Sequence, residues 1–408
     1  MEYIEKVLGM TAGVNVRVSP DRILITDGPG HEAAEKIMGL CTEAAFSGNV
    51  LKGDADAVLK SPEQLSESVK DRISVIFDHD VPCGSFSNAF IQKHLISFAK
   101  ENALEFTQAE GVGYQLMYSK INSGEILAGC GQHNSFVGAK GAIGISLSED
   151  QMAGLLTEGS IELTVPETIH ITLKGKLAEG VSAYDAALSI AAKLISAAGG
   201  KAIEYSDMTE GGLSEDDKKL ICMFAQRCGA FCAYFGEGDV KDAETDLSQI
   251  RQVIGWPAEA LDERSAVKSQ GTVKLMDSHA DVSVNACFIG GCAGGRIEDL
   301  RIAAGILKGK RIKRELRLTI GFVDNDTFLK AVHEGLIDIF FDAGAQVTNP
   351  GCASCRSTSI GVIGDGEVLA TTGCYSYRGC IGTDNSSVYI ASVGSVAKAA
   401  LTGVLSVN

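Results

Sequence analysis

GGCAGGR at residues 290–296 and NPGCASC at residues 349–355 are the two short sequences around which the rest of this chain is organised. Each places cysteine among small residues and turn formers, where the backbone can closely approach a bulky group. Residues 296–304, which follow, have apolar side chains at helical spacing. Cys292 is therefore expected just before the first turn of a helix, where backbone N–H groups and the helix dipole favour a thiolate or an anionic cluster.

These two sequences contribute three cysteines, Cys292, Cys352 and Cys355. A cubane iron–sulfur cluster normally takes four thiolates. With three thiolates, one iron keeps an open position and can act as a Lewis acid toward a substrate oxygen. The C-x2-C spacing of the second sequence does not select this chemistry by itself, because zinc and redox sites share the spacing. Small buried cysteines without a metal fit it as well.

The region around Cys292 resembles the aconitase superfamily, and within it the large subunits of 3-isopropylmalate dehydratase. GGCAGGRIEDLR at residues 290–301 corresponds to a family loop that reads CTNGRIEDLR, and residues 350–355 correspond to the family's PGCxxC. The resemblance implies a [4Fe–4S] cluster held by Cys292, Cys352 and Cys355. It also implies an α/β fold of three α/β/α domains around a cluster cleft, without the swivelling fourth domain that the family's enzymes need.

Length and composition limit the class of protein. The 408 residues are 45% hydrophobic and too many for one ordinary core, so we expect two or three domains. The formal net charge of −16, with no long Lys/Arg run, argues against a nucleic-acid partner. The N-terminus lacks a signal-peptide pattern, and no apolar stretch is long enough to predict a membrane span. Twelve cysteines in such a chain indicate a cytoplasmic protein, with thiols free or bound to metal.

The pattern along the chain divides it into three parts. Residues 1–165 are expected to form a first α/β domain, residues 166–270 a second, and residues 271–408 a third that carries the three cysteines. In the third domain, residues 316–322 and 337–341 are expected to be strands that flank a helix, which gives this domain a βαβ character.

Two histidines in the first domain are candidate catalytic residues. Asp78 and His79 follow the apolar strand 73–77, and such a pair suits proton transfer because the carboxylate fixes the imidazole tautomer. The family has Asp-His at this point in its active site, so the resemblance implies catalytic roles for both. It also aligns His133 with the histidine of the family's GDSHT, and its neighbours Gln132 and Asn134 are then expected to contact substrate.

Glycines recur every three residues after this loop and indicate close backbone packing at residues 138, 141 and 144.

The second domain departs from the family pattern. The helix expected over residues 216–229 corresponds to the family's CNMxxExG, in which the asparagine and glutamate face the cluster. Here Met223 and Arg227 occupy those two positions, so an apolar residue and a reversed charge replace both polar groups. Glu204, from an earlier Glu-Tyr pair, matches the family and is expected to be catalytic.

The C-terminal region departs as well. The family recognises substrate carboxylates with the arginines of NRNFxGR, and here Tyr375 and Cys380 stand at the two arginine positions. Neither can reproduce bidentate recognition by a guanidinium group. We therefore expect a less cationic, more sulfur-rich pocket, with Tyr375, Arg356 and Arg378 contacting the substrate. Four other cysteines fall in loops that border the family's site, and at least one is expected close to the cluster: Cys83, Cys130, Cys374 and Cys380.

The resemblance implies a [4Fe–4S]-dependent hydro-lyase (dehydratase or isomerase) that acts on a small hydroxy acid other than 3-isopropylmalate. The open iron would bind the substrate hydroxyl, and His79 and His133 would assist its loss as water. No GSSRE sequence is present, so a small swivelling-domain subunit would supply the serine base in a heterodimer. Two alternatives remain open: an iron–sulfur protein for sulfur handling, sensing or scaffolding, and structural zinc at Cys352 and Cys355.

Overall fold

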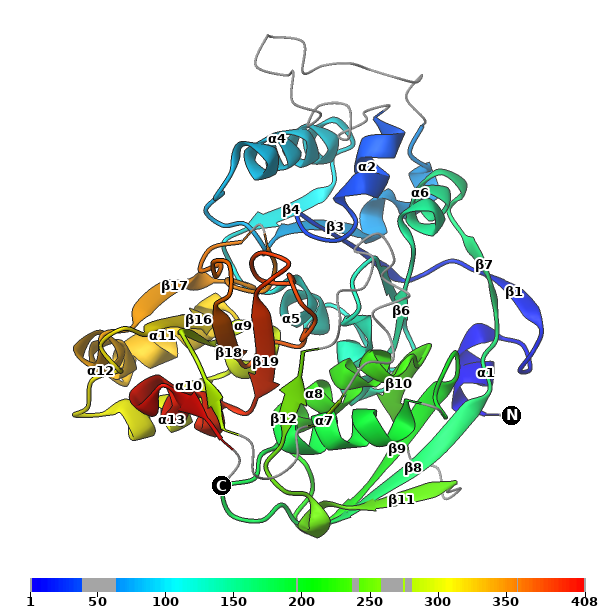
Figure 1. Ribbon diagram of the computed structural model, residues 1–408. Coiled ribbons are helices and arrows are strands. Elements are labelled where there is room, and N and C mark those ends of the chain that lie inside the picture. Colours follow the sequence, from blue (N-terminus) through cyan, green and yellow to red (C-terminus); the bar gives the residue numbers. More distant parts are fainter. Residues whose placement is uncertain are drawn as a thin grey trace.

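A computed structural model describes residues 2–38, 64–195, 197–236, 242–257, 274–275, 281–357 and 359–406. Three mainly parallel sheets with their helices form the body of the molecule and meet at its centre (Figure 1). This arrangement agrees with the predicted α/β class. No described helix has both the length and the apolar character needed to cross a lipid bilayer.

The first sheet has five parallel strands in the order β4-β3-β2-β5-β6. Its strands are β2 (Arg22–Thr26), β3 (Ile73–Phe77), β4 (Glu105–Gln108), β5 (Ile126–Gly129) and β6 (Ile143–Ser146). Every residue of β3 and β5 is buried, as expected for central strands covered by helices on both faces. The helices around it are α2 (His31–Ile37), α4 (Phe86–Glu101), α5 (Gly113–Tyr118) and α6 (Glu149–Glu158), with α2, α4 and α6 together on one side in Figure 1.

The second sheet has four parallel strands in the order β10-β9-β8-β11. They are β8 (Thr168–Gly175), β9 (Ala202–Thr209), β10 (Cys232–Phe235) and β11 (Ala243–Asp246). The helices α7 (Ala183–Leu194), α8 (Glu215–Ala225) and η3 (Gln226–Cys228) accompany them. The helix predicted over residues 216–229 is therefore α8 with a tighter 3-10 turn, η3, at its end, and this turn carries Arg227.

The third sheet has seven strands in the order β13-β12-β19-β18-β15-β16-β17. They are β12 (Ile254–Trp256), β13 (Lys274–Leu275), β15 (Ala286–Ile289), β16 (Arg317–Phe322), β17 (Gln346–Pro350), β18 (Val368–Thr371) and β19 (Ser387–Ala391). All are parallel except β12, which runs antiparallel to both neighbours. Its helices are α9 (Gly291–Gly294), α10 (Ile297–Leu307), α11 (Asn325–His333), α12 (Leu336–Ala343) and α13 (Val393–Thr402).

Shorter elements complete the described fold. β1 (Asn15–Val18) pairs with β7 (Ile161–Thr164), and β14 (Val282–Ser283) pairs with β20 (Val404–Leu405), both antiparallel. The remaining helical segments are α1 (Tyr3–Leu8), η1 (Glu67–Arg72), η2 (Asn134–Lys140) and η4 (Leu247–Gln249).

Two predictions about the third part of the chain are corrected. Residues 337–341 are not a strand, because they lie within α12. The buried residues of α12 are Leu336, Phe340 and Ala343, which share one helix face, and Phe341 is 58% exposed. The third sheet also begins before residue 271, since β12 pairs with β19.

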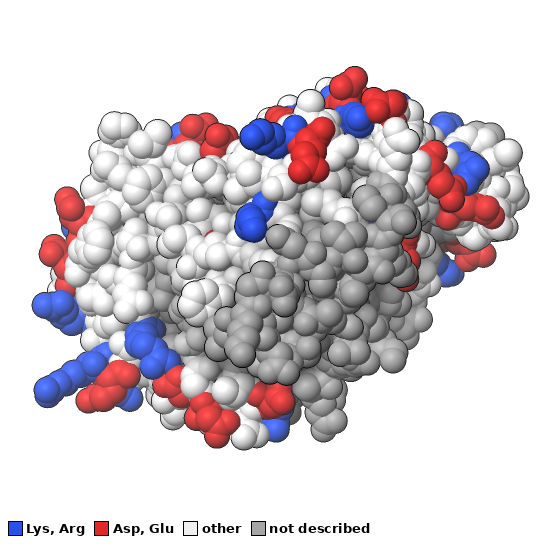
Figure 2. All heavy atoms as spheres, turned by 90° about the horizontal axis from the view of Figure 1, so that it is seen from above, with Lys and Arg blue, Asp and Glu red and all other residues white. Residues whose placement is uncertain are grey.

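Charged side chains are spread around the molecule. On the face in Figure 2, Lys and Arg alternate with Asp and Glu near the edge, and the described centre of this face carries few charges. The acidic excess of the sequence is therefore not gathered into one block among the described residues of this face.

Close backbone packing joins the first sheet to the second. A β-carbon added at Gly138, in η2, would lie 1.9 Å from the carbonyl oxygen of Ala233 in β10. One at Gly144 would lie 1.9 Å from the carbonyl oxygen of Asn134. Close backbone packing is thus confirmed at Gly138 and Gly144, whereas Gly141 follows η2 as its C-cap with a φ of +79°.

Gly138→Ala is predicted to lower the free energy of unfolding by about 1–3 kcal/mol, because the backbone must move to admit the methyl group. Urea unfolding followed by circular dichroism measures the change. Gly154→Ala in α6 is the control: nothing lies within 4 Å of the added carbon, so it should be neutral or stabilising by about 0.5–1 kcal/mol. Equal midpoints for both variants would contradict the packing.

Candidate metal centre

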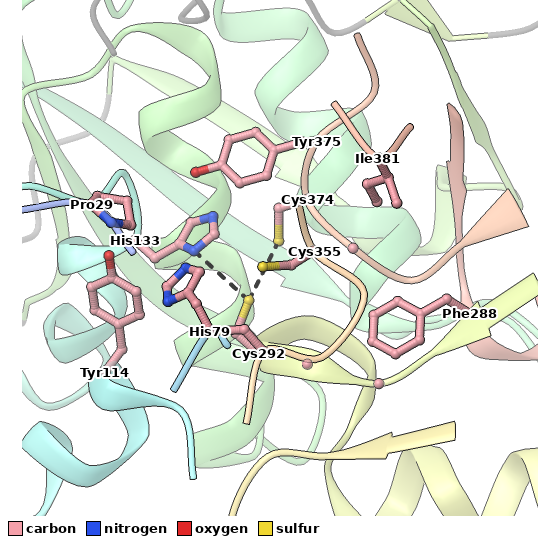
Figure 3. A pocket seen from close by; sticks show the side chains of 14 residues that line it. Pro29, His79, Tyr114, His133, Phe288, Cys292, Cys355, Cys374, Tyr375 and Ile381 are labelled. Atoms are coloured by element: carbon pink, nitrogen blue, oxygen red, sulfur yellow. Dashed lines mark hydrogen bonds between the residues drawn. The ribbon is translucent and has the colours of Figure 1, made fainter. Parts of the chain in front are cut away.

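A pocket lies where the carboxyl ends of strands from the first and third sheets meet. Ligands commonly bind at this end of parallel strands. Loops after β3 and β5 bring two histidines. The short helix α9 after β15, which contains Cys292, and the loops after β17 and β18 bring four cysteines. The side chains that can bind a metal at this pocket are His79, His133, Cys292, Cys352, Cys355 and Cys374. Figure 3 shows both imidazole rings beside the sulfur atoms of Cys292, Cys355 and Cys374.

One half of the pocket is built on Asp78. Its carboxylate lies 2.5 Å from His79 Nδ1 and accepts hydrogen bonds from the Gly113 backbone N–H at 2.7 Å and from the Cys352 thiol at 3.7 Å. Its carbonyl oxygen accepts a hydrogen bond from the Cys352 N–H at 2.7 Å. The ligand atoms of His79, Cys352 and Cys355 all lie within 4.8 Å of one another. This half therefore contains the predicted Asp–His pair and two of the predicted cysteines.

Hydrogen bonds to Asp27 hold the loop that carries His79. The buried Asp27 carboxylate accepts hydrogen bonds from the backbone N–H groups of residues 78, 79 and 80 at 2.9–3.1 Å. The turn at residues 28–30 then packs directly on the histidine, since a β-carbon at Gly28 would lie 2.6 Å from the His79 ring. This turn therefore helps to orient His79.

The other half of the pocket contains His133, Cys292 and Cys374, whose ligand atoms also lie within 4.8 Å of one another. Cys292 Sγ is 3.8 Å from His133 Nδ1 and 3.9 Å from Cys374 Sγ. Nε2 of His133 is buried and has no hydrogen-bond partner among the described residues. Of the four additional cysteines suspected from the sequence, Cys374 lines this pocket and the other three do not.

Charge in the pocket favours thiolates beside the histidines. A hydrogen bond from Cys352 and the charge of His79 lower the pKa of Cys355 to about 5. A hydrogen bond from Cys374, together with His133, lowers the pKa of Cys292 well below its usual value. Burial alone would lower the pKa of His79, but Asp78 outweighs it and raises this pKa. The pocket therefore pairs each of two thiolates with a histidine.

The other expected substrate contacts are divided between the pocket and its surroundings. Tyr375 lines the pocket, with its ring 5.4 Å from that of His133. Arg356 forms an ion pair with the buried Asp80 at 3.0 Å. Burial, opposed by Arg356, raises the pKa of Asp80 to about 6. Arg378 is exposed.

Gln132, Asn134 and Glu204 are buried but do not line the pocket. Asn134 Nδ2 lies 2.8–3.2 Å from three backbone carbonyl oxygens and the Ser146 hydroxyl, which share its two N–H donors, and this holds the His133 loop against β6. Glu204, in β9, lies 3.8 Å from Nδ1 of His170 and accepts a hydrogen bond from the Tyr234 hydroxyl. The structure thus gathers the cysteines and histidines but leaves these three polar groups outside.

Arg227 lies near the pocket, and the sequence did not predict what surrounds its side chain. Its side chain is 2% exposed, and its guanidinium carbon lies 5.2 Å from the centre of the Tyr375 ring. Nε and Nη1 have no hydrogen-bond partner in the described part of the chain. The reversed charge at this position was visible in the sequence, but its place behind Tyr375 was not.

The donor set defines a class of protein: an α/β protein with a sulfur-rich centre at the carboxyl ends of its strands. Thiolates with imidazoles select soft or borderline metals and iron–sulfur clusters over Mg²⁺ or Ca²⁺. A [4Fe–4S] cluster fits these residues, because three cysteine sulfurs converge on one pocket from two loops rich in small residues.

Comparison with known proteins gives the family. A model of the aconitase family (aconitate hydratase) matches residues 11–243 and 237–403. A 3-isopropylmalate dehydratase large subunit of Elusimicrobium minutum is 33% identical over 82% of this chain and 85% of its own. One from Archaeoglobus fulgidus is 28% identical over 92% and 98%. A probable methanogen homoaconitase large subunit of Methanothermobacter thermautotrophicus is 28% identical over 82% and 83%. The chain belongs to the aconitase family.

A solved structure supports the fold. The holo-form of aconitase X from Thermococcus kodakaraensis superimposes with a TM-score of 0.53, covering 91% of this chain and 89% of that one at 13% identity. The predicted aconitase-type fold is therefore confirmed.

In the metal-free, reduced protein, Cys355 is predicted to react with iodoacetamide from about pH 5 upward, because its depressed pKa leaves thiolate above that pH. Mass spectrometry of samples labelled at increasing pH measures the profile. Cys83 is the control, since burial raises its pKa and it should react only at alkaline pH. His79→Gln should move the Cys355 profile to higher pH. Parallel profiles for Cys83 and Cys355 would contradict the depressed pKa, and an unchanged Cys355 profile in His79→Gln would contradict the pairing with His79.

Proposed function

We propose that this chain is the large subunit of a [4Fe–4S]-dependent hydro-lyase that acts on a small hydroxy acid other than 3-isopropylmalate. The observation that carries the proposal is the convergence of Cys292, Cys352 and Cys355 with His79 and His133 in one pocket. Membership of the aconitase family supports hydro-lyase chemistry. Relatives named as large subunits support a small partner subunit.

The three cysteines would hold the cluster, which supplies a Lewis acid for the departing hydroxyl group when it is bound. Asp78 fixes the ring of His79 and raises its pKa, so His79 is suited to carry a proton at neutral pH and deliver it to a leaving oxygen. His133 lies beside Cys292, with its Nδ1 3.8 Å from the sulfur, and Tyr375 and Tyr114 pack against its ring. The partner subunit would bring the base that removes the substrate proton.

The pocket supports a substrate other than 3-isopropylmalate. The described residues that line it include no lysine or arginine, whereas the strongest side-chain recognition of a carboxylate is a bidentate pair with arginine. Arg356 is paired with Asp80, and Arg378 is exposed. A small hydroxy acid with fewer carboxylates would bury fewer unpaired charges on entering such a pocket, so its binding would cost less free energy.

Anaerobic reconstitution with iron and sulfide is predicted to give about four irons and four sulfides per chain. Cys292→Ala and Cys355→Ala should each lower both contents, because a cysteine ligand is lost. Cys287→Ala is the matched control: Cys287 is buried in β15, outside the pocket. Chemical analysis of iron and sulfide measures the result. Zinc without sulfide would support structural zinc instead and contradict the proposal.

With a small subunit of this family added, His79→Gln is predicted to lower kcat about 10²–10⁴-fold, because glutamine cannot transfer a proton. Formation of the unsaturated acid from a panel of 2-hydroxy acids, followed by ultraviolet absorbance, measures the rate. His333→Ala, an exposed residue of α11, is the control and should retain full activity. A loaded, complemented enzyme that dehydrates no member of the panel would argue against the hydro-lyase.

A further inference from the structure

We propose that Tyr114 is a substrate-binding residue of the pocket, whose phenolic hydroxyl donates a hydrogen bond to an oxygen of the hydroxy acid. This inference rests on the proposed function, which identifies the ligand as a hydroxy acid. It leaves the cluster with its three cysteines and its open iron.

Tyr114 lies in the wall of the pocket beside one of its two histidines. The residue is 4% exposed and lines the pocket. Its ring packs edge to face against that of His133, and the two ring centres are 5.6 Å apart. In Figure 3 its hydroxyl points toward Pro29, which also lines the pocket. A ligand that reaches His133 through the pocket therefore comes close to this phenol.

Backbone hydrogen bonds fix the start of α5, the helix that carries Tyr114. The N–H of Gly113 donates to the carboxylate of Asp78 at 2.7 Å, and the N–H of Val112 donates to the carbonyl of Val323 at 2.8 Å. The first bond ties Tyr114 to the buried acid of the pocket, and the second ties it to the end of β16 in the third sheet. A side chain on a backbone held in this way can bind a ligand with little loss of conformational entropy.

The hydroxyl of Tyr114 occupies a space that only glycine at position 131 leaves free. A β-carbon added at Gly131 would lie 1.5 Å from this oxygen and 2.8 Å from the ring carbon that bears it. The GDSHT sequence of the family has aspartate where this chain has Gly131. A side chain at position 131 is incompatible with Tyr114 in its present place, so the loss of the aspartate and the position of the phenol belong together.

This exchange changes what the wall beside His133 can bind. An ionised aspartate only accepts hydrogen bonds, whereas a phenol can donate one. Burial, reinforced by Tyr375, raises the pKa of Tyr114, so its hydroxyl keeps its proton at neutral pH. The loss of a negative charge also lowers the cost of bringing an anion to this wall. Tyr114 is therefore suited to a carbonyl or carboxylate oxygen, the acceptor groups of a hydroxy acid.

Isothermal titration calorimetry of the anaerobically reconstituted large subunit tests the contact, with glycolate, lactate and malate as probes. Tyr114→Phe keeps the ring and removes the hydroxyl. It is expected to weaken binding of the acids about 10–100-fold, because a buried oxygen of the ligand loses its donor. Tyr118→Phe is the matched control, since it removes a phenol hydroxyl from the same helix outside the pocket, and its affinities should equal those of the wild type. Iron and sulfide contents should be equal in all the proteins, because the proposed cluster ligands are cysteines.

Equal affinities in the wild type and Tyr114→Phe would overturn the role of Tyr114, and so would equal losses in Tyr114→Phe and Tyr118→Phe. A loaded wild type that binds none of the acids would reject this role together with the hydroxy-acid ligand of the proposed function. If the wild type binds an acid without dehydrating it and Tyr114→Phe weakens that binding, the contact is supported and the hydro-lyase is not. Turnover with an affinity that Tyr114→Phe leaves unchanged rejects only the role of Tyr114.

The space shared by Tyr114 and Gly131 has its own readout. Gly131→Ala should lower the midpoint of urea unfolding and weaken acid binding, because Tyr114 must move away from the added methyl group. In a Tyr114→Phe background the same change should lower the midpoint less, because the oxygen at 1.5 Å is absent. Additive effects in this double-mutant cycle would show that the hydroxyl does not occupy the space, and would overturn the link between Tyr114 and Gly131.

Discussion

The carboxylate and carbonyl of Asp78 join the two parts of the molecule that form the centre. The residue follows a strand of the first sheet, yet its carbonyl accepts the N–H of Cys352, which follows a strand of the third. Its carboxylate holds His79, the Gly113 N–H and the Cys352 thiol together. Because all these partners converge on one buried acid, a small shift of either sheet would disturb histidine and cysteine at once.

The carboxyl ends of the parallel strands position most of the metal-binding side chains around Asp78. The segments after β3, β5, β15, β17 and β18 contribute histidines or cysteines, and the parallel direction of these strands brings the segments to one place. The helices that accompany the second sheet contribute Arg227, which contacts the Tyr375 ring, and the Tyr184 hydroxyl, which donates to the Gly373 carbonyl. The centre therefore depends on all three sheets, although its metal-binding side chains come from two of them.

Much of this could be predicted from the sequence, because short motifs carry the information. Cys292, Cys352, Cys355 and the two histidines occupy loops that residue spacing and family resemblance identify, and they share one pocket. Residues 337–341 failed as a strand because a short apolar run fits a strand or a buried helix face equally well.

What escaped prediction depends on long-range packing. Asn134 follows the catalytic candidate His133 directly, but its amide is consumed by backbone groups of the neighbouring strands. No local pattern reveals that choice. Likewise, Arg227 and Tyr375 are far apart in the chain and meet only once the second and third sheets pack together.

The bond between Cys352 and Asp78 has a consequence for the cohesion of the protein. Cys292 and Cys352 extend from separate loops of the third sheet toward histidines held by the first. A ligand bridging such loops binds the folded chain and not the unfolded one, so its binding free energy adds to the free energy of folding. If the proposed cluster is that ligand, its loss would weaken the contact between these two sheets before the rest of either sheet opens.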